Sequence, residues 1–169
     1  MRIPLISFSV LFLLFSTLVF PQGQEQKEKK MPKDELEELM NSAIPFAQKM
    51  LKEHGEFFPY GEAIDSHGKI VAVGAHDGRE QPPSTELIRL LTDGLRAGAK
   101  SGEYKATAIV YDVRIIPPGS NEKSDAIAIN LDHRDGLSII TFLPYKISGK
   151  DVIYGEMFAQ KGEAKIFQR

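Results

Sequence analysis

Residues 104–145 read YKATAIVYDVRIIPPGSNEKSDAIAINLDHRDGLSIITFLPY, and this stretch decides the fold. It contains three runs rich in β-branched and aromatic residues, 104–116, 125–133 and 137–145. Such runs, separated by turn-forming residues, are typical of β-strands. The Asp135-Gly136 pair between the last two runs indicates a hairpin, in which the two strands must be antiparallel.

The first of these runs has one apolar side and one charged side. Successive side chains of a strand point to opposite faces of the sheet. One face therefore receives Ile109, Tyr111, Val113 and Ile115, and the other receives Asp112 and Arg114. This pattern favours a sheet that is covered on one face.

Further strands are predicted on either side of this stretch. Upstream, 57–64 and 69–75 are short β-prone runs, and the Asp65-Ser66-His67-Gly68 segment between them indicates a second hairpin. Downstream, the spacing predicts a strand over 152–159 and a short final one near 164–167.

Two helices are predicted from apolar residues that recur every three or four positions. The first covers 34–53, is kinked or split at Pro45, and ends at Gly55. The second starts with Ser84 as N-cap and ends before Gly102. Gly94 and Gly98 inside this second helix indicate close packing against the sheet.

The predicted order is helix, two strands, helix, then three or four strands. We therefore expect an α+β fold, in which an antiparallel sheet of five or six strands carries both helices on one face. This element order is similar to that of profilin-like and roadblock-like domains.

The first residues are predicted to be an export signal rather than part of the folded domain. Residues 1–23 carry Arg2, an uncharged apolar run over 3–20, and then a polar segment, which are the parts of a signal peptide. The alternative is an uncleaved membrane anchor or tether through 3–20. Residues 24–34 are expected to be a polar linker, and 35–169 a single α+β domain. The predicted location is therefore periplasmic or extracellular, or membrane-anchored in the alternative.

Composition excludes several classes of function. The chain has 169 residues, a formal net charge of −2 and no cysteine. That charge gives no reason to expect nucleic acid as a partner. Without cysteine there is no disulfide, thiolate zinc site, iron–sulfur cluster or cysteine nucleophile. No nucleotide-binding loop or hydrolase motif is present either, so we predict neither a cofactor nor a metal.

Imidazole and carboxylate groups meet in two predicted turns, His76-Asp77-Gly78 and His133-Arg134-Asp135-Gly136. His133 with Asp132 or Asp135, completed by His76 and Asp77, would be a candidate metal site or general base. However, Asp132 and His133 are adjacent on a strand and so point to opposite faces. Asp-Gly pairs are also explained by turn geometry alone, which is the interpretation we favour.

Aromatic residues next to prolines suggest a contact surface. Phe58 and Tyr60 flank Pro59, and Tyr145 follows Pro144. Proline suits a sheet edge because it has no N–H to donate, and exposed aromatic side chains are favoured at interfaces. The alternative, which we favour, is that these aromatics cap the core beneath the helices.

The Phe58-Pro59-Tyr60-Gly61, Asp65-x-x-Gly68, His133-Arg134-Asp135-Gly136 and Leu143-Pro144-Tyr145 motifs resemble a small bacterial domain family of undefined function. The resemblance spans about 36–167. It implies an α+β domain and a bacterial origin, and it implies no activity, ligand or catalytic residue.

The predicted function is that of an exported, non-catalytic module that binds an envelope or extracellular protein or a small ligand. The candidate binding residues are Phe58, Tyr60, His133, Asp135 and Tyr145. The alternative is a hydrolase or metal-dependent enzyme that uses His133 with nearby carboxylates, and a purely structural envelope protein is a third class.

Overall fold

The computed structural model describes residues 30–168. The signal peptide or anchor predicted over 1–23, and most of the predicted linker, lie outside the described residues. The described part contains two helices, α1 (Pro32–His54) and α2 (Ser84–Ser101). It also contains the strands β1 (Tyr60–Asp65), β2 (Ile70–Val73), β3 (Tyr104–Ile115), β4 (Ser124–His133), β5 (Ser138–Ser148), β6 (Asp151–Tyr154) and β7 (Phe158–Lys161). Neither described helix is both long and apolar enough to cross a bilayer.

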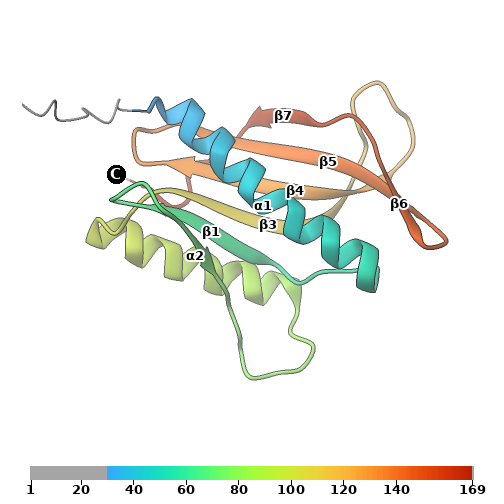
Figure 1. The fold of residues 1–169 in the computed structure, drawn as a ribbon, viewed down its shortest axis with the longest axis horizontal. Coiled ribbons are helices and arrows are strands. Elements are labelled where there is room, and N and C mark those ends of the chain that lie inside the picture. Colours follow the sequence, from blue (N-terminus) through green and yellow to red (C-terminus); the bar gives the residue numbers. More distant parts are fainter. Residues whose placement is uncertain (1–29, 169) are drawn as a thin grey trace, which may run out of the picture.

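All strands join one antiparallel sheet (Figure 1). Its order is β2-β1-β3-β4-β5-β6, and β7 pairs with a different part of β5. The α+β class and the antiparallel sheet are confirmed, with seven strands in place of the expected five or six. The extra strand arises because the run predicted over 152–159 divides into β6 and β7 around Gly155.

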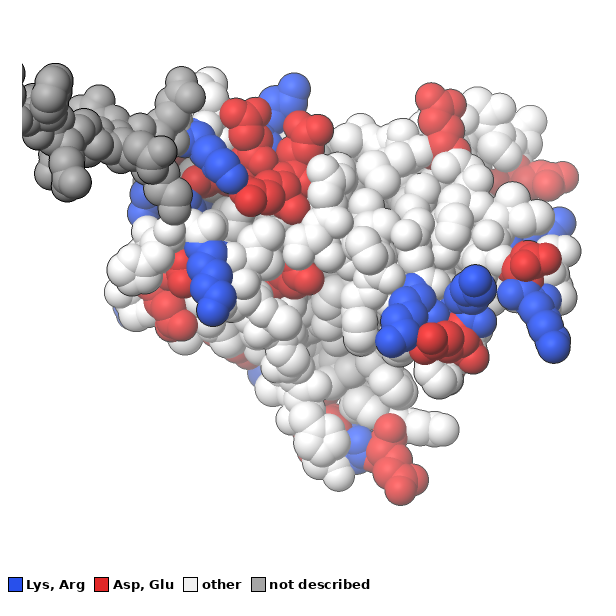
Figure 2. All heavy atoms as spheres, viewed as in Figure 1, with Lys and Arg blue, Asp and Glu red and all other residues white. Residues whose placement is uncertain are grey.

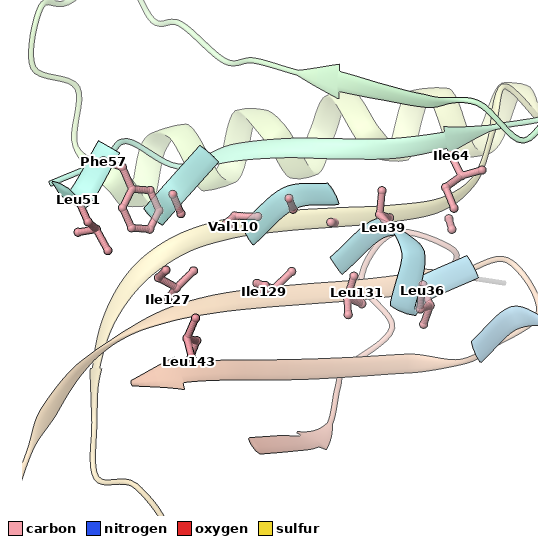
Figure 3. Close-up of a cluster of buried hydrophobic side chains, with 14 of the residues drawn as sticks. Leu36, Leu39, Leu51, Phe57, Ile64, Val110, Ile127, Ile129, Leu131 and Leu143 are labelled. Carbon is pink, nitrogen blue, oxygen red and sulfur yellow. The ribbon is translucent and has the colours of Figure 1, made fainter. Parts of the chain in front are cut away.

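One core lies between α1 and the sheet (Figure 3). Ala43 and Ala47 of α1 share this core with Ala106 and Ala108 of β3, and all four side chains are fully buried. Larger members come from both layers: Leu36, Leu39, Leu51, Val110, Ile127, Ile129, Leu131 and Leu143. Small side chains at the centre let the helix approach the sheet closely, while the leucines and isoleucines fill the space around them.

A second core lies on the opposite face, under α2. Leu91 and Leu95 of α2 cluster with Ala63 and Ile109. On β3, Ile109 lies between Ala108 and Val110, which both belong to the α1 core. Since neighbouring side chains of a strand point to opposite faces, α1 and α2 cover opposite faces of the sheet. In Figure 3, accordingly, the cut turns of α1 lie in front of the sheet and α2 lies behind it.

The expectation that both helices share one face is thus wrong, and chain topology gives the reason. β2 and β3 both pair antiparallel with β1, so they run in the same direction. A connection between two such strands must cross one face of the sheet, and α2 is that connection. α1 precedes β1 and is free to cover the other face, which is equally apolar at β3.

Two local expectations about the helices also change. Ser84 is the first helical residue, Pro83 occupies the N-cap position, and no side chain caps this end. α1 is continuous through Pro45 to His54. The C-terminal ends are as predicted, since Gly55 and Gly102 have φ of 77° and 79° and close the two helices in the left-handed conformation. The final segment near 164–167 forms no strand.

Gly98 marks a close contact, whereas Gly94 does not. A Cβ atom added at Gly98 would lie 2.3 Å from the ring of Tyr104, but one added at Gly94 meets nothing within 4 Å. Gly98→Ala should therefore destabilise the fold by about 1–3 kcal/mol because the Tyr104 ring must move. Gly94→Ala, the matched control, should stabilise it by roughly 0.5–1 kcal/mol through helix propensity. Urea unfolding followed by circular dichroism checks both; equal shifts of the two midpoints would contradict the contact.

Candidate functional site

The predicted binding residues lie apart from one another. Tyr60, the first residue of β1, is level with Val110 and Ile129 in the middle of β3 and β4. His133, the last residue of β4, is level with Ala106 near the start of β3. Tyr145 lies on β5, separated from β1 by two strands. The five residues therefore do not form a single site.

Tyr60 and Tyr145 are largely built into the α1 core. The Tyr60 hydroxyl donates to the Ala43 carbonyl of α1 at 2.7 Å, and the Tyr145 hydroxyl donates to Asp112 Oδ1 at 2.9 Å. Burial raises the pKa of both phenols, and for Tyr145 the hydrogen bond to Asp112 raises it further. Both hydroxyls therefore serve as neutral donors: that of Tyr60 ties α1 to the sheet, and that of Tyr145 ties β5 to β3.

Phe58 remains at the surface. It is 49% exposed, and Phe46 of α1 is 48% exposed. The Phe46 ring meets Tyr60 edge-on at 4.9 Å between centroids. Figure 2, which views the α1 side, shows charged groups near both ends of α1 and a broad uncharged surface between them. The contact surface expected at Phe58 and Tyr60 is therefore compatible with their positions, but it does not include Tyr145.

His133 belongs to a buried polar cluster that joins α1 to the sheet. Its Nε2 lies 2.9 Å from Glu35 Oε2, and its side chain is 3% exposed. Its Nδ1 accepts the Asp135 backbone N–H at 3.1 Å, so the proton of a neutral ring is on Nε2 and is donated to Glu35. Both ring nitrogens are thus engaged within the fold, and Asp135 itself is an exposed turn residue.

Lys105 completes this cluster by donating to Glu35 Oε1. Its neighbour Ala106 faces α1, so regular alternation would place Lys105 on the opposite face. The register between β1 and β3 shifts at this point, where Asp65 pairs with Tyr104 and Ile64 with Ala106. A β-bulge of this kind redirects a side chain, and here it brings Lys105 to the α1 face. We call Glu35, Lys105 and His133 the Glu35 cluster.

The Glu35 cluster is electrostatically satisfied. Burial alone would raise the pKa of Glu35, but hydrogen bonds from Lys105 and His133 outweigh it and lower that pKa. The carboxylate is therefore ionised near neutral pH and has a donor on each oxygen. This arrangement is that of a structural ion pair, because the imidazole has no free nitrogen to offer a substrate.

Asp132 performs a different task on the opposite face. Its Oδ2 accepts the backbone N–H groups of Lys165 and Ile166 at 2.8 and 3.0 Å. Arg96 Nε of α2 donates to the Lys165 carbonyl at 2.6 Å. Asp132 and Arg96 thereby hold residues 163–168, which we call the C-terminal segment, against the α2 face. The expected opposition of Asp132 and His133 is confirmed.

His76 lies far from His133 along the sheet. Val73 at the end of β2 is level with Gly61, so His76 lies beyond the Tyr60 end, whereas His133 is at the Ile64 end. Asp77 is paired with Arg79 in the exposed loop that follows β2. Within residues 30–168, no group of three or more His, Asp or Glu side chains is arranged to hold a metal ion.

A cavity of about 180 Å³ lies on the α2 face, between α2, the sheet and the C-terminal segment. It is lined by Ile88, Thr92, Ile109, Tyr111, Asn130, Asp132, Glu163, Lys165 and Ile166. Three of these lining residues are isoleucines, and Asp132, Glu163 and Lys165 are charged. The other polar groups include the Tyr111 hydroxyl, which lies 3.4 Å from Asn130 Nδ2. A partly open hollow that combines apolar walls with placed polar groups has the general character of small-molecule sites.

Reasoning from the sequence did not find Glu35, Lys105, Tyr111 or Asn130 as site residues. Glu35 and His133 are separated by 98 positions, and no local pattern connects them. Asn130 does carry a signal, since it is a polar residue within the apolar run AIAINL of β4.

No protein-family model matches the chain, and searches of curated proteins and of solved structures found no similar protein. The resemblance to a bacterial domain family therefore stays a prediction.

Replacing Glu35 should expose how much the cluster contributes. Glu35→Gln leaves the partly buried Lys105 ammonium without its counter-charge, so we expect a loss of about 2–3 kcal/mol in the free energy of unfolding at pH 7. Glu37→Gln removes an exposed carboxylate from the same helical turn and should change stability by less than about 0.5 kcal/mol. Equal urea midpoints for the two variants would contradict a stabilising Glu35 cluster.

The same cluster predicts a pH dependence. The pKa of Glu35 is lowered from 4.5, so its contribution is fully present above pH 4.5 and is lost as the pH falls through the lower folded-state value. The difference in unfolding free energy between the native protein and Glu35→Gln should accordingly shrink below pH 4.5. A difference that stays constant from pH 7 to pH 2 would contradict the ionised carboxylate.

Proposed function

We propose that this protein is an exported, non-catalytic module that binds a small molecule in the cavity on the α2 face. The observation that supports this proposal best is the cavity itself, because it combines three isoleucine walls with the Tyr111 hydroxyl and the Asn130 amide. A cavity of ~150 Å³ is large enough to hold benzene. The ligand class is therefore a compact molecule of about one ring that carries a hydrogen-bonding group.

The position of the cavity also supports a binding role. One of its walls is the C-terminal segment, which forms no strand or helix and is held by the hydrogen bonds to Asp132 and Arg96. Breaking these few bonds would open the cavity without disturbing the sheet. A cavity with such a segment as one wall admits a ligand more readily than a cavity whose walls are all strands and helices.

The enzyme hypothesis has less support from the geometry. The imidazole of His133 is 3% exposed, and both of its nitrogens are hydrogen-bonded. A general base needs a nitrogen within reach of the substrate proton. For this reason we assign His133 a structural role, in place of the predicted binding or catalytic one.

Binding is tested with 4-methylphenol, which has one ring and one hydroxyl. In a titration of the purified exported protein followed by NMR, amide signals of the cavity residues should shift and saturate. Thr92→Phe fills the cavity and should abolish binding, whereas Thr85→Phe places the same side chain on the exposed start of α2 and should leave it unchanged. Unsaturable shifts, or equal binding by both variants, would overturn the proposal.

The contribution of the Tyr111 hydroxyl can be measured separately. Tyr111→Phe should weaken 4-methylphenol binding about 2- to 10-fold, as expected for one lost hydrogen bond. Tyr104→Phe is the matched control, because Tyr104 also faces the α2 side but does not line the cavity. If both variants bind equally, the hydroxyl does not contact the ligand.

Export is tested by cell fractionation. We expect the mature protein in the periplasmic or extracellular fraction, with an N-terminus near residues 22–25 by mass spectrometry. Full-length protein confined to washed membranes would identify the apolar run as an anchor instead.

A further inference from the structure

A second hollow, of about 510 Å³, lies on the same face at the end of α2. It is lined by Arg96, Ala99, Lys100, Arg134, Ile166, Phe167 and Gln168, and we call it the basic hollow. Residues from α2, the β4–β5 turn and the C-terminal segment thus meet there. Ile166 lines both the basic hollow and the cavity.

The charge of the basic hollow has a single sign. Its lining contains Arg96, Lys100 and Arg134 but no Asp or Glu, although acidic residues outnumber basic ones in the whole chain, 23 to 21. Among the described residues, neither Lys100 nor Arg134 forms a salt bridge within 4 Å. Positive side chains that converge on one hollow attract an anion.

The backbone of the turn that carries Arg134 and the guanidinium group of Arg96 are both held in place. The backbone N–H of Arg134 donates to the Lys105 carbonyl at 2.9 Å, which fixes the turn to β3. Arg96 Nε donates to the Lys165 carbonyl at 2.6 Å, so its guanidinium group is anchored beside the C-terminal segment. The anchored guanidinium group of Arg96, whose Nη1 also lies 3.8 Å from Asp93 Oδ1, loses less entropy when it binds carboxylate or phosphate.

The negative dipole at the C-terminal end of α2 repels an anion only weakly. Its last carbonyl groups would carry partial negative charge, but Gly102 N–H donates to Ala99 and Glu103 N–H to Gly98. These bonds satisfy the carbonyl groups of Gly98 and Ala99. Lys100 in the last turn offsets the remaining helix dipole.

The hollow is also partly apolar. Ala99, Ile166 and Phe167 contribute carbon surface next to the cations. A free inorganic ion would gain nothing from this surface, whereas an anion attached to an apolar group would cover it and gain free energy from its burial. We propose that the basic hollow binds a small organic anion, whose phosphate or carboxylate group contacts Arg96, Lys100 and Arg134 and whose apolar body lies against Phe167.

This proposal is independent of the cavity, and the experiment separates the two. The purified exported protein is titrated by calorimetry with phenyl phosphate, benzoate and inorganic phosphate. We expect phenyl phosphate or benzoate to bind at least tenfold more tightly than inorganic phosphate. Binding should weaken as salt is raised, because the contact is between charges. Thr92→Phe, which fills the cavity, should leave this binding unchanged.

Variants then locate the site. The double variant Lys100→Gln, Arg134→Gln should weaken organic-anion binding at least tenfold. The control, Lys49→Gln with Lys52→Gln, makes the same change in net charge on α1, at the opposite face, and should leave it unchanged. Equal loss in both double variants, or no binding by either organic anion, would overturn the proposal. Equal affinity for inorganic phosphate would overturn the role of Phe167.

Discussion

The two-sided burial of β3 is the constraint on which the rest of the structure depends. Residues 106–110 are all buried, so the middle of this strand needs cover on both faces. α1 covers one face, and α2 crosses the other on its way from β2 to β3. Because α2 packs against β1 and β3, the C-terminal segment is left to cover the adjoining part of β4. The cavity and the basic hollow both lie along this join.

The two sides of the sheet are secured by consecutive residues of β4. Asp132 holds the C-terminal segment on the α2 face, and His133 contacts Glu35 of α1 on the other. Each side chain is largely buried and hydrogen-bonded, as buried polar groups must be if they are not to cost stability. The residues that most suggested catalysis in the sequence, Asp132 and His133, therefore add a polar contact to the packing on each face of the sheet.

The strands, the helices and the tight turns could be predicted from the sequence because their causes are local. The Asp135-Gly136 turn, for example, needs the positive φ of 90° that Gly136 adopts. The placement of the helices on opposite faces of the sheet depends on both faces of β3 being apolar. Continuous runs such as ATAIV and AIAI are typical of strands buried on both sides, whereas the alternation of Ile109, Tyr111, Val113 and Ile115 favours cover on one side only. The Glu35 cluster depends on a bulge and on residues distant in the chain, which no periodicity reveals.

The opposite placement of the two helices is tested most directly by NMR contacts between methyl groups. We expect nuclear Overhauser effects from Leu91 and Leu95 of α2 to Ala63 and Ile109. We also expect them from Leu39 and Ala43 of α1 to Ala108 and Val110. If contacts placed both helices over Ala108 and Val110, the α2 face would be bare, and the cavity and the basic hollow would not exist as described.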